Sequence, residues 1–283
     1  MRSNHSVLLR ILAVTALLYF PTPGFAMILG TVESFAVLGG STVTNTGSSI
    51  VTGDLGVNPG SAITGFPPGT VSGTIHGPDG VSLQAQSDAA AAYTGLAGMP
   101  FSSNLTGQDL GGLTLISGVY HFDTSAQLTG PLTLDAQGLD NAFWAFQVGS
   151  TLTTASASSV ALINPGLNNG VFWQVGSSAT LGTGTSFLGN ILADQSITLT
   201  TNADILCGRA LALNGAVTMD TNTISAICAE GVSQGFSGGL VFNENGQVVP
   251  GPSTSTVVPE PATLVLLGSG LLGLRFKKNK SAV

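Results

Sequence analysis

The chain has 283 residues, of which 43% are hydrophobic and only 7% are charged, so it can bury a sizeable core and must stay soluble largely through hydroxyl, amide and backbone groups. Between positions 11 and 274, Arg209 is the only lysine or arginine. We therefore expect no nucleic-acid partner, because a polyanion binder needs a basic patch that releases counterions.

The first 26 residues are typical of a secretory signal peptide. Arg2 and Arg10 precede or enter an apolar run at 7–20, and small residues lead up to Ala26. The run is shorter than the ~20 residues that a membrane span requires, although a retained anchor is the alternative. We expect cleavage after Ala26 and export of the mature protein.

Short strands are predicted from Thr31 to about Ile227, because runs of Val, Ile, Leu, Phe and Thr alternate there with turn residues. One segment differs. Residues 81–98 are rich in alanine and their apolar positions approximate helical spacing, with Gly98 and Pro100 as stop signals. We predict one helix of about four turns beside a β body.

The β part repeats its own sequence. "FWAFQVGSTLTT" (143–154) matches "VFWQVGSSATLGT" (171–183), and "GNILADQSITLTTN" (189–202) matches "GRALALNGAVTMDTN" (208–222). The alignment places four large apolar residues in register: Leu152, Leu181, Leu199 and Met219. Recurring units of this length indicate a solenoid, in which each coil buries its apolar face against its neighbours. A β-sandwich or barrel is the main alternative.

The repeats also align hydroxyl side chains, because Thr-x-x-Thr recurs in four successive units. Neighbours in a strand point to opposite faces, so threonines beside inward-pointing leucines point outward, and stacked coils arrange them in rows. The predicted face comprises Thr151, Thr153, Thr154, Thr180, Thr183, Thr185, Thr198, Thr200, Thr201, Thr218, Thr221 and Thr223. Threonine also has a high β propensity, so a merely solvated strand surface is the alternative.

Cys207 and Cys228 are the only cysteines and lie about one coil apart. Adjacent strands are about 4.8 Å apart, and an oxidising compartment permits a disulfide over that separation. We expect this disulfide, with two free buried thiols as the alternative. His76 and His121 have no cysteine, histidine or acidic neighbours at ligand spacing, so we predict no metal site and no cofactor.

No catalytic constellation is apparent, and we predict that the protein is not an enzyme. Solenoid lyases and hydrolases use paired carboxylates, or a carboxylate with a basic residue, in a groove. Here Arg209 lies inside a repeat unit, with Asn190 as its counterpart in the preceding copy, which indicates a structural role. Trp144 and Trp173 align as repeat positions and are predicted to lie in the core.

Residues 29–227 resemble the ice-binding-like domain of cold-adapted bacteria, diatoms and fungi. The matching segments include "FAVLGGSTVTNTGSSIVTGDLGVNPGSAITGFPPGTVSGTIH" (35–76), "LTGQDLGGLTLISGVYHF" (105–122), 171–199 and 208–224. The resemblance implies an all-β fold, an irregular right-handed parallel β-solenoid of triangular section with one long α-helix packed alongside. It also implies adsorption to an ice crystal surface through a flat threonine-rich face.

The family's Thr-Ala/Gly-x-Thr/Asn motif occurs here in partial copies, such as residues 154–157, 183–186 and 201–204. Each copy departs from the motif at its last residue or earlier. The resemblance therefore implies the fold more strongly than it implies a high ice activity.

Residues 257–280, "VVPEPATLVLLGSGLLGLRFKKNK", resemble the PEP-CTERM sorting signal of Gram-negative bacteria. The segment combines the motif Pro259, Glu260 and Pro261 with an apolar stretch at 262–274 and a basic tail. The resemblance implies a precursor transiently anchored in the membrane at its C-terminus, a sorting protease (exosortase) as a partner, and a secreted or cell-surface product.

We divide the chain into a signal peptide (1–26), a solenoid domain (27–230), a Gly/Ser/Pro-rich linker (231–257) and a sorting segment (258–283). The expected function is ice binding by an exported monomer that inhibits ice growth or recrystallisation. A structural or adhesion protein that binds extracellular polysaccharide on the same fold is the alternative.

Overall fold

The structure is mostly β, with parallel pairing in its two large sheets and one long helix. The computed structural model describes residues 26–228 and 234–252. The predicted signal peptide, apart from its last residue, and the predicted sorting segment lie outside the described residues. Within the described ranges, no helix has the length and hydropathy of a membrane span.

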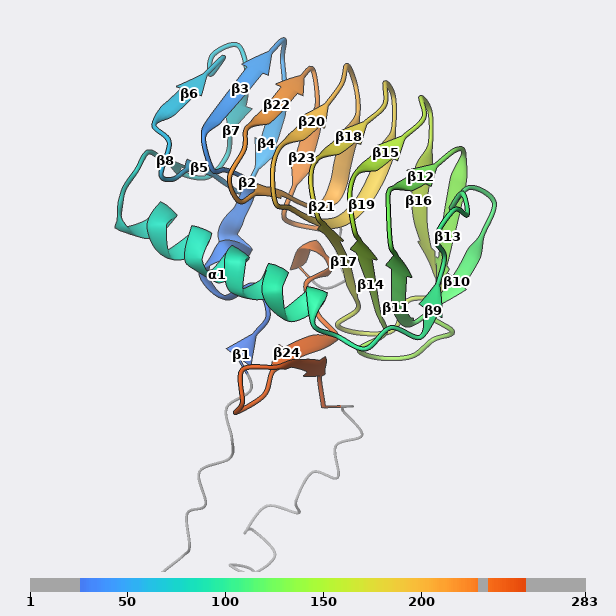
Figure 1. The fold of residues 1–283 in the computed structure, drawn as a ribbon. Coiled ribbons are helices and arrows are strands. Elements are labelled where there is room, and N and C mark those ends of the chain that lie inside the picture. Colours follow the sequence, from blue (N-terminus) through green and yellow to red (C-terminus); the bar gives the residue numbers. More distant parts are fainter. Residues whose placement is uncertain (1–25, 229–233, 253–283) are drawn as a thin grey trace, which may run out of the picture.

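The first sheet has seven strands, which lie side by side along the upper edge of the molecule in Figure 1. Their order is β12 (Ala126–Leu128), β15 (Leu152–Thr154), β18 (Ala179–Leu181), β20 (Ile197–Leu199), β22 (Val217–Asp220), β3 (Thr42–Thr46) and β6 (Ala62–Thr64). All neighbours in this sheet are parallel.

The second sheet has fifteen strands in two rows that share β19 (Ser186–Ala193) and β21 (Asp204–Ala212). The helix-side row adds β8 (Ile75–His76), β5 (Asp54–Val57), β2 (Phe35–Gly39), β17 (Gly170–Val175), β14 (Phe143–Val148), β11 (Gly118–Phe122) and β9 (Ser103–Asn104). The other row, which we call the mixed row, adds β7 (Thr70–Val71), β4 (Ile50–Thr52), β23 (Thr223–Ser225), β16 (Ser159–Ile163), β13 (Pro131–Asp135) and β10 (Thr114–Ile116).

From β12 onward, the chain visits the seven-stranded sheet, the mixed row and the helix-side row in turn. Each coil therefore adds strand structure to three faces and stacks on the coil before it (Figure 1). Parallel stacking of this kind favours the predicted solenoid over a β-sandwich, whose sheets are antiparallel.

The order of the coils in space differs from their order in the sequence. The N-terminal strands β2 and β3 pair with β21 and β22 of the last repeats, so the first and last parts of the solenoid domain are neighbours. The helix α1 (Gly80–Ala97) then leads the chain along the body to β9 at its other end (Figure 1). The predicted helix at 81–98 is thus confirmed.

The sequence explains how α1 begins and which side it buries. Asp79 is its N-cap and forms a reciprocal capping box with Ser82. Ala85, Ala89, Ala92 and Leu96 recur at helical spacing and are buried against the helix-side row. The small alanines allow the helix axis to approach the sheet closely.

The interior is filled by large side chains that follow one another from coil to coil. Trp144 and Trp173 are both 0% exposed, which confirms their predicted place in the core. The rings of Phe146 and Trp173 stack with centroids 3.9 Å apart. Burial of aromatic side chains on successive coils contributes much of the hydrophobic stabilisation of such a fold.

A disulfide joins Cys207 on β21 to Cys228 beyond β23, with Cα atoms 5.0 Å apart, as predicted. Arg209 pairs in register with Asn190 and is 0% exposed, and its guanidinium donates to Asn190 Oδ1 at 2.7 Å. It also donates to the carbonyl oxygens of Glu33 and Gly235. Burial lowers the pKa of Arg209 to about 10, so it remains charged at neutral pH. The predicted structural role of Arg209 is confirmed.

The prediction of a linker at 231–257 is wrong for its described part. Residues 234–252 fold back on the body as η3 (Gln234–Phe236), β24 (Leu240–Phe242) and β25 (Val248–Pro250), with β24 antiparallel to β1 (Ala26–Met27). Phe236, Leu240 and Val248 are buried. The Gly-rich composition indicated a linker, but Leu240 and Val248 pack into the apolar cluster between α1 and the helix-side row.

Candidate functional site

A single row of threonines crosses the outward side of the seven-stranded sheet. Strand pairing places six threonines in register, each on the strand next to the previous one: Thr153, Thr180, Thr198, Thr218, Thr44 and Thr64. We call these residues the threonine row, and the outward side of the sheet the threonine face. Adjacent strands lie about 4.8 Å apart, so the row extends over about 24 Å. Gln127 on β12 occupies the next position.

Alternation along the strands fixes the direction of these side chains. Immediately before each threonine stands an apolar residue that points inward, and all of these are buried except the half-buried Ile63: Leu152, Ala179, Ile197, Val217, Val43 and Ile63. The threonines themselves are exposed or half-buried. Burial of the preceding apolar residue therefore fixes the outward direction of each threonine side chain.

Most hydroxyls of the threonine row are free to bind external water. Among the described residues, the side chains of Thr153, Thr180, Thr198 and Thr64 form no hydrogen bond, whereas Thr44 Oγ1 donates to Thr218 Oγ1 at 3.4 Å. Threonine is branched at Cβ and is therefore stiff at its first side-chain torsion. The row thus presents methyl and hydroxyl groups at fixed positions.

The outward positions that precede the threonine row carry only small side chains. Backbone hydrogen bonds between neighbouring strands align them: Ser125, Thr151, Ser178, Ser196, Ala216, Thr42 and Ala62. Ser125 and Thr151 share a hydrogen bond of 2.8 Å between their hydroxyls. Small side chains beside the row leave the threonine methyls and hydroxyls accessible.

The predicted residues Thr183, Thr200, Thr201 and Thr221 lie where the strands of this sheet end and the chain turns toward the mixed row. Thr200 Oγ1 donates to the carbonyl oxygen of Leu181 at 2.8 Å and lies 3.4 Å from Thr183 Oγ1. Thr201 and Thr221 both donate to the carboxylate of Asp220. These hydroxyls already have protein partners, unlike most of the threonine row.

Asp220 is a carboxylate at this border of the threonine face. The hydrogen bond from Thr201 is the main cause that lowers the pKa of Asp220, with further donation from Thr46 and Thr221. Asp220 is therefore ionised at neutral pH.

Three of the predicted residues lie off the threonine face. Thr154 and Thr185 are 3% and 1% exposed, and their hydroxyls hydrogen-bond to each other at 2.8 Å. The prediction that they are exposed is wrong, because Thr154 follows the outward Thr153 and must point inward. Thr223 begins β23 and lies on the mixed row, not on the threonine face.

The predicted register is correct for Leu181, Leu199 and Met219 but wrong for Leu152, which pairs with Ala179. The error is two residues, and a shift of two preserves alternation. All four of these side chains are buried, as predicted.

Sequence reasoning missed Thr42, Thr44 and Thr64. Their strands lie outside the matched repeats in the sequence, and they join the threonine face only because β3 pairs with β22. The alternation of "STVTNT" at 41–46 was the available signal, since it places valine between two threonines.

The outward side of the mixed row, which we call the mixed face, lacks this uniformity. One row of register positions reads Pro131, Ser159, Ser186, Asp204, Thr223, Ile50 and Thr70. Ile50 and Leu206 are 52% and 53% exposed on this side. Its side chains differ in size, charge and polarity from coil to coil.

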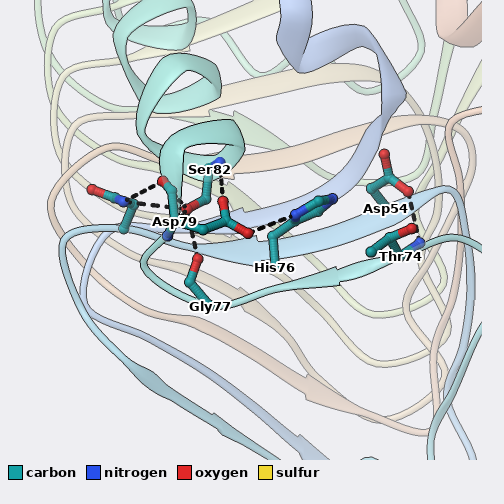
Figure 2. Close-up of polar contacts among 7 residues, drawn as sticks. Asp54, Thr74, His76, Gly77, Asp79 and Ser82 are labelled. Atoms are coloured by element: carbon teal, nitrogen blue, oxygen red, sulfur yellow. Dashed lines mark hydrogen bonds and ion pairs between the residues drawn. The ribbon is translucent and has the colours of Figure 1, made fainter.

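The two histidines expected to lack acidic neighbours each have one. His76 Nδ1 lies 2.9 Å from Asp79 Oδ2, and His121 Nε2 lies 3.0 Å from Asp123 Oδ1. Figure 2 shows His76 beside the N-terminus of α1, where Asp79 also accepts the backbone N–H of Ser82 at 2.8 Å. In the part of the chain that the structure describes, no three His, Cys, Asp or Glu residues gather as a metal site.

The Ser82 N–H is the main cause that lowers the pKa of Asp79 from 3.8 to about 2, and the hydrogen bond with His76 adds to it. Figure 2 also shows Asp54, which accepts the backbone N–H of Thr74 at 2.7 Å. These contacts cap a helix and a strand end, and they account for both carboxylates structurally.

Comparison with known proteins bears on this geometry. The sequence model of a family described as ice-binding-like matches residues 37–225, and that of the PEP-CTERM protein-sorting motif matches residues 257–279. An ice-binding protein of Nostoc sp. is 54% identical over 274 residues, which cover 95% of this chain and 94% of that protein. An ice-binding protein of Flavobacterium frigoris is 32% identical, with 70% of this chain and 75% of that protein covered.

Solved structures agree. The crystal structure of an ice-binding protein from an Antarctic biological consortium superposes with a TM-score of 0.68 and 44% identity, over 72% of this chain and 93% of that one. The structure of an ice-binding protein from Antarctomyces psychrotrophicus gives a TM-score of 0.67 and 40% identity, over 70% and 97%.

Proposed function

The chain belongs to the ice-binding-like family, and we propose that it is an exported protein that adsorbs to ice through the threonine face and inhibits ice growth or recrystallisation outside the cell. The observation that carries the assignment of this face is the threonine row, with six identical side chains in register on adjacent strands. A solvated β surface has no need of such uniformity, as the mixed face of the same coils illustrates.

The physical basis is a match of spacing and stiffness. Adjacent strands lie about 4.8 Å apart, and outward residues along each strand lie about 6.6–7 Å apart. Hydroxyl and methyl groups therefore form a grid with spacings similar to the oxygen repeats in ice. Each side chain that must be immobilised on binding costs about 0.5–1.5 kcal/mol, and β-branched threonine on a parallel sheet loses little freedom. Many weak contacts can then add up to stable adsorption.

The scarcity of charge also supports this proposal. Arg209 is the only lysine or arginine among the described residues, and it is buried. The threonine face is therefore free of the cationic side chains whose hydration shells would disturb an ice-like water layer. Asp220 stands only at its border, where threonines hold its carboxylate.

We further propose that the winding is right-handed and triangular in section, that the protein acts as a monomer, and that it performs no enzymatic reaction. Residues 1–26 would direct export, and the matched sorting motif at 257–279 would pass the chain to a sorting protease. The product would be secreted or remain on the cell surface.

The test is to purify residues 27–257 and to measure thermal hysteresis and ice recrystallisation. We expect faceted crystals and inhibited recrystallisation at micromolar concentration. A hydroxyl-rich face with little charge could also stack on sugar rings, and export by way of the matched sorting motif would bring the protein to extracellular polysaccharide. No effect on ice, together with retention on a polysaccharide column, would favour that second function.

A further inference from the structure

The chain ends lie together on one small sheet. β1 pairs antiparallel with β24, and β24 pairs with β25. Just beyond β25, the side-chain amide of Asn141 donates to the carbonyl oxygen of Pro252, the last described residue, at 3.1 Å. Both ends of the described chain therefore leave the body from the same place.

This small sheet lies on the helix side of the body. Leu240 and Val248 share an apolar cluster with α1 and with Phe172, Leu192 and Leu211, which project outward from the helix-side row. The threonine face belongs to the other large sheet. In Figure 1 the seven-stranded sheet lies along the upper edge, and β1 and β24 lie at the lower edge, where the described part of the chain begins and ends.

The sorting motif follows closely. It matches from residue 257, five residues after Pro252, and five residues extend over at most about 18 Å. Whatever holds the chain at this motif therefore lies near the β1–β24–β25 side of the body. The described surface has no lysine or arginine side chain exposed, so an anionic lipid surface does not attract the body toward it.

We propose, on the basis of the function proposed above, that the form still attached through its C-terminal segment anchors the cell to ice, because the threonine face is held directed away from the attached surface. The partner on one side is an ice crystal, and on the other it is the lipid surface to which the sorting motif, matched from residue 257, attaches the chain. Because the C-terminal attachment and the threonine face lie on opposite sides of the body, the same fold then attaches the cell to ice as well as inhibiting ice growth.

The experiment places the full chain in vesicles of phosphatidylethanolamine and phosphatidylglycerol that contain a fluorescent dye, and measures vesicle uptake into a slowly growing ice hemisphere. The same chain in detergent micelles is assayed in parallel, which tests ice binding without a tethering surface. The variants are the pair Thr198→Tyr with Thr218→Tyr on the threonine face, and the matched pair Thr52→Tyr with Thr223→Tyr on the mixed face.

We expect wild-type and mixed-face vesicles to enter the ice about tenfold more than protein-free vesicles, and threonine-face variants to fall to that background. Uptake from micelles without uptake of vesicles would overturn the proposed anchoring and leave ice binding intact. Failure of the micellar chain itself would overturn the proposed function, and the anchoring with it.

A labelling measurement tests the orientation directly. Thr198→Cys in outward-facing chains should react with a polyethylene-glycol maleimide as fast on vesicles as in micelles, whereas Asn245→Cys, in the turn between β24 and β25, should react more slowly on vesicles. Slower reaction of Thr198→Cys on vesicles would mean that the face points toward the lipid, which would contradict the proposal.

Discussion

The threonine face and the mixed face are built from the same coils by the same parallel pairing, yet only one of them is uniform. On the threonine face, a single outward position is threonine on six adjacent strands. On the mixed face, equivalent positions include proline, serine, aspartate and isoleucine. The stability of the fold depends on the inward residues of both faces and depends little on the outward ones. Uniformity on one face therefore indicates a ligand with a repeating surface.

Inward residues of both faces belong to one hydrophobic core, so damage to the core should destabilise both faces. Replacement of Arg209 by methionine would leave buried acceptors on Glu33, Asn190 and Gly235 unpaired. We expect the free energy of unfolding to fall by about 3 kcal/mol in urea denaturation. Gln195→Met at an exposed position is the control. A loss below about 1 kcal/mol would mean that Arg209 is not an anchor of the fold.

Two neighbouring threonines of β15 point in opposite directions, Thr153 to the surface and Thr154 to the core. Thr154 Oγ1 hydrogen-bonds to Thr185 and accepts the backbone N–H of Gly182, whereas Thr153 lies on the threonine row. Thr154→Val should lower the free energy of unfolding by about 1–2 kcal/mol and leave the ice activity of the folded protein unchanged. Thr153→Val should change stability by less than about 0.5 kcal/mol. Equal stability losses would show that the assigned directions are incorrect.

The corners between the two faces allow a smaller, reciprocal test. Thr221 and Asn202 both have a left-handed backbone, with φ of 56° and 57°. Asparagine tolerates this region better than a β-branched residue, so Thr221→Asn should stabilise the protein by about 0.5–1 kcal/mol and Asn202→Thr should destabilise it similarly. Thermal unfolding curves measure both. The same sign for the two changes would refute the backbone argument.

The smallest effect concerns the helix that lies apart from both faces. The folded-state pKa of Asp79 is depressed to about 2, so the stabilisation from its ionised form is present above pH ~4 and is lost as pH falls toward 2. Asp79→Asn should weaken this dependence below pH ~4 without changing ice activity at neutral pH. An unaltered acid profile in the variant would show that other carboxylates dominate.

The sequence was sufficient for the elements that depend on local pattern. The spacing of alanines predicted α1, and alternation placed Thr198 and Thr218 outward, because both properties are set within a single segment. Thr44 and Thr64 could not be found in this way. They join the row only because α1 leads the chain to the far end and the later coils return to β3.

The error at Leu152 has a similar origin. Matching Thr151-Leu152 to Thr180-Leu181 by residue type shifts the strand by two, whereas alignment on Gly149 and Gly176 gives the observed pairing of Thr153 with Thr180. Identity of residue type at repeat positions does not fix register, because a shift of two satisfies the same inward and outward pattern. The fold-back of residues 234–252 was missed because it depends on tertiary contacts of Leu240 and Val248.

Thermal hysteresis of two matched double variants tests the central claim most directly. Thr198→Tyr with Thr218→Tyr places bulky rings in the middle of the threonine row, and Thr52→Tyr with Thr223→Tyr places the same rings on the mixed face. With both variants folded by circular dichroism, we predict about a tenfold or greater loss of activity for the first pair, since each 1.4 kcal/mol of lost adsorption energy is a factor of ten, and activity close to wild type for the second. Full activity in the first pair, or loss in the second alone, would contradict the assignment of the threonine face.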